Sequence, residues 1–558
     1  MPDFDDDCTW PRRLLHIPTM ISVHWTPGNC YGSDREPRYI AISYTWGRWR
    51  LKGPTHPEVK GLAVNGVTWE MPRVDPAHFS TAEMENILGS ALKLSAEIEN
   101  FNDPGKSLPP INYLWLDVAC IDQTRGSVEM ASEVGRQAKI FRGATHTFAW
   151  LTKLSRQEYL SQSGRHQELA KPSRAEAKSG ADKVRRGLDI NRLEIEQLSL
   201  DPWFSSLWTL QEAYLCPQAM FITRQGELLS QSDIETPAKD PMLLSYFIDY
   251  CDHMLTIVTA HEKKPQTIAP DDRYLLALKQ SLERSGMVGL RSTLPITLLG
   301  AARYRTTTRV TDRVYGIMQV FGFRLGKSKP GCNPNVEIPL QELEDELGQE
   351  LLIREPVMSQ MHVFEGLPQV GKGWRISQDS RPTRRLHLVN HTYGDGKSVF
   401  EDISTKAQLS TIALDGITWG YFNGKTCKFT KLVEIWDSDK GWGGGIIDLD
   451  GLENWTAVHG PDIAREEALT FSQKHPDAVV LLLGLPEGGA SHASSRMPIG
   501  LLLVPFSRQS VVSKSVDMWQ RAGVCQWWTS HVPNHSSEVV RTLEGESGDW
   551  ILSAGAFG

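Results

Sequence analysis

The sequence predicts an α/β fold for the N-terminal part of the chain, with a parallel sheet flanked by helices. Three short apolar runs, at residues 38–44, 111–120 and 145–151, are typical of buried strands. Segments with apolar residues at helical spacing separate them. Strands that alternate with helices form parallel sheets, because each helix crosses the sheet to start the next strand.

The length of the chain predicts more than one domain. A chain of 558 residues is too long for one core. We expect a loop-rich lead-in at residues 1–38, an α/β unit at residues 39–226, a helical region at residues 227–330 and a β-containing region of unassigned role at residues 331–558. The polar, charged segment at residues 154–191 is expected to be an insertion in the α/β unit.

Composition and charge narrow the classes of partner. The net charge is −8 and the pI is about 6.1. The chain therefore lacks the excess of basic residues that is typical of proteins that bind nucleic acid or an anionic membrane surface. The most apolar runs, residues 478–485 and 499–506, are too short to span a bilayer as helices. The eight cysteines form no C-x-x-C pair, and the acidic N-terminal stretch lacks the apolar core of a signal peptide. We therefore expect a cytoplasmic protein with free thiols, no metal and no bound cofactor.

The first strand ends in residues that can form the lip of a cleft. In an α/β sheet, ligands bind outside the carboxyl ends of the strands. Ser43, Tyr44, Trp46 and Gly47 stand at that end and are candidate pocket residues. A core strand followed by a glycine turn explains the same residues and is favoured on local sequence alone.

The second and third strands follow in order. Ser80 and Glu83 form a capping box that opens a helix. The next strand, at residues 111–120, carries Asp117 towards its carboxyl end, where it can either face a pocket or cap the following turn. A helix at residues 128–141 then precedes the third strand, and residues 219–223 are expected to form an edge strand.

A helix starting near Pro202 carries the most informative pair of side chains. Pro202 suits the first helical turn and Asp201 can cap it. Trp208 and Glu212 are four residues apart and share one face. A carboxyl held against an indole is partly desolvated, which raises its pKa. Glu212 is therefore a candidate active-site group, or else a member of a structural network.

Three segments resemble the fungal heterokaryon-incompatibility (HET) domain. Residues 39–47, 114–123 and 203–212 look like its first, second and third motifs, and they occur in the family's order. The chain departs from the family pattern at two positions. Asp122 stands where Asn is usual, and Ser206 stands where Arg is usual.

The HET family is similar to Toll/interleukin-receptor (TIR) domains, so the resemblance implies a flavodoxin/TIR-like parallel sheet. Some members of that wider group cleave NAD at the nicotinamide–ribose bond, and their helix carries Ser-x-Trp-x-x-x-Glu. Ser206, Trp208 and Glu212 stand at that spacing. The resemblance implies that Glu212 is the catalytic carboxylate and that NAD is a substrate.

The resemblance also assigns roles to the other candidates. Tyr44, Trp46 or Trp208 would stack on a flat ring, although each aromatic taken singly also suits a core. Asp117 and Asp122 would contact ribose hydroxyls or orient water. An ionised carboxylate would stabilise the positive charge that develops on the ribose.

Two functions follow from the resemblance. The first is a self/non-self recognition effector that triggers programmed cell death, a form of innate immunity, by consuming NAD. Its partners would be a second copy of the chain or another incompatibility protein. The second is a non-catalytic signalling or scaffolding module, in which Ser206 and Asp122 mark a degenerate pocket.

Overall fold

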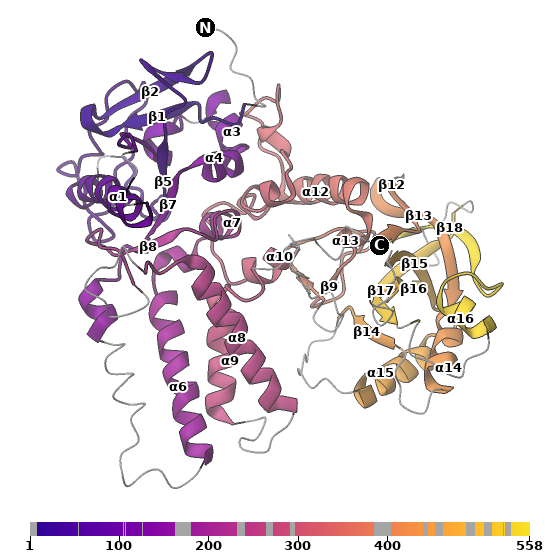
Figure 1. Cartoon of the computed structure of the whole chain (residues 1–558). Helices are drawn as coiled ribbons and strands as arrows, with labels where there is room; N and C mark the ends of the chain where they lie inside the picture. Colours follow the sequence, from indigo (N-terminus) through magenta and orange to yellow (C-terminus); the bar gives the residue numbers. More distant parts are fainter. Residues whose placement is uncertain are drawn as a thin grey trace. The chain divides into compact units, whose positions relative to one another are not determined.

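A computed structural model describes most of the chain (Figure 1). Its residues fall into two compact units, one formed by residues 1–291 and 301–340 and the other by residues 292–300 and 341–558. Part of the expected insertion at residues 154–191 lies outside the described residues. The described residues are all except 1–7, 54, 104, 106–107, 125, 162–179, 231–239, 264–271, 291–295, 384–402, 439–444, 452–460, 487–496, 507–515, 528 and 530–536.

The first unit is built on one mixed sheet of eight strands. Four neighbouring strands are parallel, and four short antiparallel strands extend the sheet at one edge. In order across the sheet the strands are β4 (Asp34–Arg35), β3 (Cys30–Tyr31), β2 (Ile21–Thr26), β1 (Arg13–His16), β6 (Tyr113–Trp115), β5 (Tyr39–Ser43), β7 (His146–Trp150) and β8 (Met220–Ile222).

The predicted parallel sheet is thus confirmed for β5, β6, β7 and β8, but the prediction lacked the four antiparallel strands β1 to β4. The lead-in was expected to be loop-rich, but it contributes β1 to β4. These strands are short, and β1 is fixed by pairing with β6 about a hundred residues away, a contact that local sequence does not encode. The β5 strand is fully buried, as its apolar run predicts.

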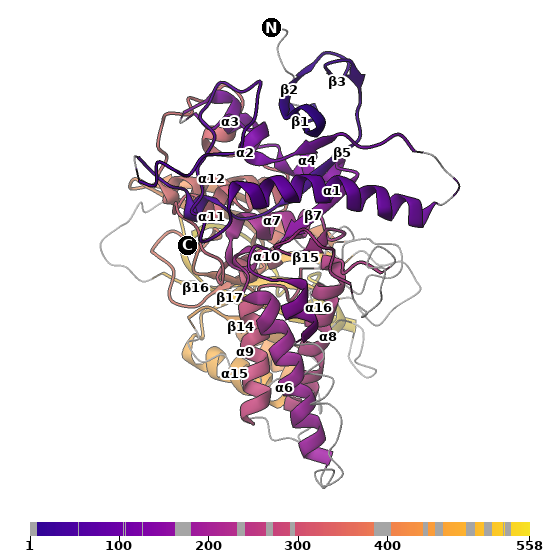
Figure 2. The ribbon, with the colours of Figure 1, turned by 90° about the vertical axis from the view of Figure 1, so that its left-hand side faces the viewer.

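Helices cover the parallel part of this sheet (Figure 2). The capping box predicted for Ser80 and Glu83 is present at the start of α1. The helices of the unit are α1 (Thr81–Asn102), α2 (Asp117–Cys120), α3 (Val128–Val134), α4 (Gln137–Gly143), α6 (Gly180–Ser199), α7 (Leu207–Leu215), α8 (Leu244–Lys263), α9 (Arg273–Ser285) and α11 (Asp312–Tyr315), and α10 (Thr297–Ala302) crosses the boundary between the units. The 3-10 turns are η1 (Ile17–Thr19), η2 (Gly47–Trp49), η3 (Pro202–Ser205), η5 (Met318–Phe321) and η6 (Gly326–Ser328).

Two expected elements are interrupted. The single helix predicted at residues 128–141 is two helices, α3 and α4. At the break, buried Arg136 donates hydrogen bonds to Glu133 and to the carbonyls of Cys8 and Trp10. The strand predicted at residues 111–120 ends early, and Asp117 begins α2 instead.

The helix expected to run from Pro202 is also divided. Asp201 caps the turn η3 by accepting from the Trp203 amide, and α7 begins only at Leu207. Between them Ser206 is extended (φ −89°, ψ 137°) and forms a β-bridge with Thr306. This long-range pairing uses the backbone groups that a continuous helix would need.

The second unit is rich in strands, as expected for the C-terminal region. Strands β15, β16, β17, β18 and β13 pair in a closed circuit, because β13 also pairs with β15. Its strands are β9 (His362–Phe364), β10 (Ser380–Pro382), β11 (Ile403–Thr405), β12 (Gln408–Leu414), β13 (Ile417–Lys428), β14 (Gly445–Leu449), β15 (Val479–Pro486), β16 (Ile499–Pro505), β17 (Met518–Trp527) and β18 (Ile551–Phe557). Its helices are α12 (Leu340–Arg354), α13 (Pro356–Ser359), α14 (Phe429–Ser438), α15 (Pro461–Lys474) and α16 (Ser537–Leu543).

Candidate functional site

The candidate residues gather at the carboxyl ends of β5 and β6. Across the sheet, β5 lies between β6 and β7, so the chain leaves β5 on one side to form β6 and later returns on the other side to form β7. Such a switch point is where open α/β sheets place their ligands. Ser43 ends β5, and Asp117 stands two residues beyond the end of β6.

Glu212 on α7 faces the end of β5. The Ser43 hydroxyl is buried and donates a hydrogen bond to Glu212 Oε2. The same hydroxyl accepts from Trp203 Nε1 at 2.7 Å. Ser43 therefore joins the third motif to the first at the carboxyl end of β5.

Asp117 organises the other side of this end of the sheet. Its carboxylate accepts from the Tyr44 hydroxyl at 2.7 Å and from Trp46 Nε1 at 2.5 Å. It also accepts from the amide of the next residue, Val118, at 2.7 Å within the first turn of α2. Asp117 thus bonds to the first turn of α2 and to two pocket candidates.

Burial makes ionisation of the Glu212 and Asp117 carboxyl groups less favourable. Desolvation and, to a smaller extent, the nearby charge of Asp117 raise the pKa of Glu212 to about 8, although the hydrogen bond from Ser43 lowers it. The residue still keeps some exposure to solvent, while protein surrounds its carboxyl. Desolvation also raises the pKa of Asp117 above its ordinary value. Two acids with raised pKa values at a strand end are a recurrent feature of active sites.

Three further candidates make contacts or turns of their own. Trp208 donates its indole N–H to Asp312 Oδ2 at 3.4 Å, and the indole linked to Glu212 through Ser43 is that of Trp203. Asp122 accepts from the Thr124 amide at 2.9 Å, so its carboxyl closes its own turn. Gly47 is exposed and begins η2.

Two arginines near α7 were not anticipated from the sequence. Arg305 is 1 % exposed and donates to the carbonyl oxygens of Trp203 and Ser206 at 2.9 and 3.3 Å. Desolvation, with the charge of Arg48 as a second cause, lowers the pKa of Arg305 to about 9. Arg48 donates to the hydroxyls of Ser205 and Thr306 at 2.9 and 2.7 Å. Cations therefore do stand beside the Ser206 turn, but they come from distant segments.

A family comparison agrees with this geometry. Residues 39–212 match the family model described as Heterokaryon incompatibility protein (HET). The chain carries a HET domain. The match begins with β5 and ends at Glu212, so the HET domain contains both the Ser43 and the Asp117 side of the site. Searches among curated proteins and among solved structures give no match.

Among the described residues, no group of three or more His, Cys, Asp or Glu side chains is arranged to hold a metal ion. No helix in the same part of the chain combines the length and apolar character needed to cross a membrane. A hollow of about 760 Å³ is lined by none of the candidate residues of the HET domain.

The raised pKa of Glu212 predicts a pH-dependent cost to stability. The folded state holds this proton more tightly than the unfolded state, so stability falls as pH rises from about 4.5 to about 8. Replacing Glu212 by Gln should raise the free energy of unfolding by about 1–2 kcal/mol at pH 8, after allowance for partial exposure. The gain should vanish near pH 4. Urea unfolding of both proteins at the two pH values checks this, and equal stability at pH 8 would contradict it.

Proposed function

We propose that the HET domain cleaves NAD at the nicotinamide–ribose bond, and that this activity triggers cell death in self/non-self recognition. The observation that carries the proposal is the contact between Glu212 and Ser43 at the carboxyl end of β5. It puts the carboxyl of Glu212, a residue of intermediate exposure, at the switch point of the sheet.

The strand order supports a flavodoxin/TIR-like assignment. Numbered along the chain, the parallel strands β5, β6, β7 and β8 stand in the order 2-1-3-4. This is the beginning of the flavodoxin-like order, in which ligands bind between the first and third strands. In this chain that position is the carboxyl end of β5 beside β7, where Glu212 meets Ser43.

The chemistry fits an ionised Glu212. When the glycosidic bond breaks, its electron pair leaves with nicotinamide as a neutral ring, so no acid is needed. The ribose becomes oxocarbenium-like, and a carboxylate beside it stabilises that charge. Water then adds to the ribose carbon, and a nearby carboxylate such as Asp117 can accept its proton. A cationic nicotinamide ring would itself favour the ionised form of Glu212.

This mechanism predicts the pH dependence of the reaction. Only the ionised form of Glu212 is active, and its pKa in the free protein is about 8. The value of kcat/KM for NAD should therefore rise about tenfold per pH unit below pH 8 and level off above it. Initial rates of nicotinamide release from pH 6 to pH 9.5 measure this. A value of kcat/KM that falls across the same pH range would mean that the catalytic group acts in its protonated form.

A non-catalytic signalling or scaffolding module is the second candidate function. Two observations favour it. Asp122 is engaged in its own turn, and Ser206 is held by backbone pairing with Thr306. In that case the Ser43–Glu212 contact is purely structural.

One assay separates the two functions. The purified full chain is incubated with NAD, with and without forced oligomerisation through a fused dimerisation module, and nicotinamide is quantified. Release in either state supports the enzyme. Absence of release in both states favours the scaffold.

A further inference from the structure

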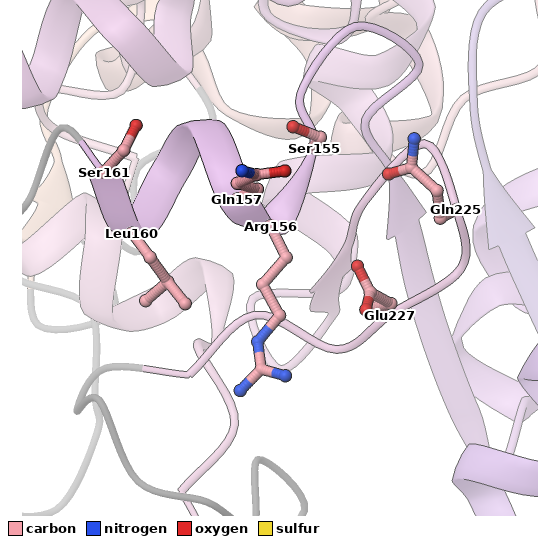
Figure 3. Close-up of a pocket in the computed structure, with 7 residues that line it drawn as sticks. All are labelled: Ser155, Arg156, Gln157, Leu160, Ser161, Gln225 and Glu227. Atoms are coloured by element: carbon pink, nitrogen blue, oxygen red, sulfur yellow. The ribbon is translucent and has the colours of Figure 1, made fainter.

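The hollow of about 760 Å³ lies at the carboxyl ends of β7 and β8 (Figure 3). One wall is the short segment that follows β7, and the other is the turn that follows β8. Its volume is in the range of small-molecule sites. Its lining includes Ser155, Arg156, Gln157, Leu160, Gln225 and Glu227.

Four polar side chains around this hollow are available to a ligand. In the described part of the chain, the side chains of Arg156, Gln157, Gln225 and Glu227 have no hydrogen-bond or ion-pair partner. Figure 3 shows Arg156 extending from the first wall, with Gln225 and Glu227 on the turn opposite. The hollow is therefore lined by a guanidinium, two amides and a carboxylate, together with the apolar side chain of Leu160.

Hydrogen bonds connect this hollow to the Glu212 site. Lys153, two residues before the first wall, donates its amide to Asp201 Oδ2 at 2.8 Å. Asp201 Oδ1 accepts from the Trp203 amide at 2.9 Å, and the Trp203 indole donates to Ser43. Ser43 in turn donates to Glu212.

The sheet fixes the spacing of the two places. Strand β7 separates β5 from β8, so about 10 Å lies between the strands that carry the two sites. Both are at carboxyl ends of parallel strands, hence on one edge of the sheet. An extended dinucleotide can reach across that distance.

We infer that the hollow binds the adenosine phosphate half of a dinucleotide whose nicotinamide riboside half lies at Glu212. This inference rests on the proposed function. The Arg156 guanidinium suits a phosphate, to which it can donate two parallel hydrogen bonds. The amides of Gln157 and Gln225 can pair with the donor and acceptor edge of adenine. Glu227 accepts from ribose hydroxyls.

The first experiment measures binding alone. Adenosine 5′-monophosphate is titrated calorimetrically into the full chain, its Arg156→Gln variant and an Arg35→Gln control. Arg35 is exposed on β4, at the opposite end of the sheet, and loses the same charge. Arg156→Gln should weaken binding by at least about tenfold, the scale of one hydrogen bond to a charged group. The control should bind like the wild type.

A second experiment keeps this inference distinct from the proposed function. With NAD and nicotinamide mononucleotide as substrates, Arg156→Gln should raise the ratio of KM for NAD to KM for the mononucleotide by about tenfold. If NAD is cleaved and the ratio is unchanged, the hollow does not bind the adenosine phosphate half, and the proposed NAD-cleaving activity is retained. If nothing is cleaved but the nucleotide binds through Arg156, the hollow is a nucleotide site and the proposed activity is wrong. Absence of nucleotide binding by the wild type contradicts the proposed role of the hollow directly.

Discussion

Replacing Glu212 by Gln should lower kcat for NAD cleavage by about a thousandfold, with KM changed less than about threefold. Gln keeps the size of the side chain and can still accept the Ser43 hydrogen bond. It cannot carry the negative charge that stabilises the oxocarbenium-like ribose. The loss therefore falls on the chemical step, and nicotinamide release measured over a range of NAD concentrations separates kcat from KM.

A matched variant controls for a general effect of losing a carboxylate. Glu85 is exposed on α1 and distant from β5 in the chain, so Glu85→Gln should keep the wild-type rate. A Glu212→Gln protein that folds and cleaves NAD within threefold of the wild type would show that Glu212 is only structural.

Replacing Arg136 by Leu should destabilise the first unit by about 3–5 kcal/mol. Arg136 and Glu133 are each 1 % exposed and form an ion pair at 3.0 Å. Arg136 also donates to the carbonyl of Cys8 at 2.8 Å, which fastens the N-terminal segment to the break between α3 and α4. Without the guanidinium, the Glu133 carboxyl is left buried, where desolvation already raises its pKa. Equilibrium urea unfolding measures the loss.

The double variant Glu133→Gln with Arg136→Leu tests this cause. A neutral amide can still accept from the Arg12 amide, which donates to Glu133 at 2.8 Å in the wild type. Because no buried charge is left unpaired, the double variant should recover more than half of the lost stability. A double variant as unstable as the single one would place the cost in the lost contact to Cys8.

Local signals predicted the elements that local physics determines. The capping box at Ser80 and the apolar runs of β5 and β7 are confirmed, because each depends on neighbouring residues. Such features carry their cause within a few residues of sequence.

Long-range contacts account for what the sequence did not reveal. Ser206 interrupts the expected helix because it pairs with Thr306, a hundred residues away. The Trp203 indole is linked to Glu212 through Ser43, because the fold brings Trp203 to the end of β5. Arg305 had no motif to mark it as a partner of the Trp203 carbonyl. Glu212 was predicted from the sequence because its spacing belongs to one recognisable motif, and its catalytic role stays a prediction.

The most direct test is the product balance of the reaction. The oligomerised wild-type chain and its Glu212→Gln variant are incubated side by side with NAD at pH 8.5, above the pKa of Glu212. Nicotinamide and ADP-ribose are then quantified by chromatography. The wild type should form both products in equal amounts, and the folded variant should form about a thousandth as much. Intact NAD after incubation with the folded wild-type oligomer would contradict the proposal that this HET domain is an NAD-cleaving enzyme.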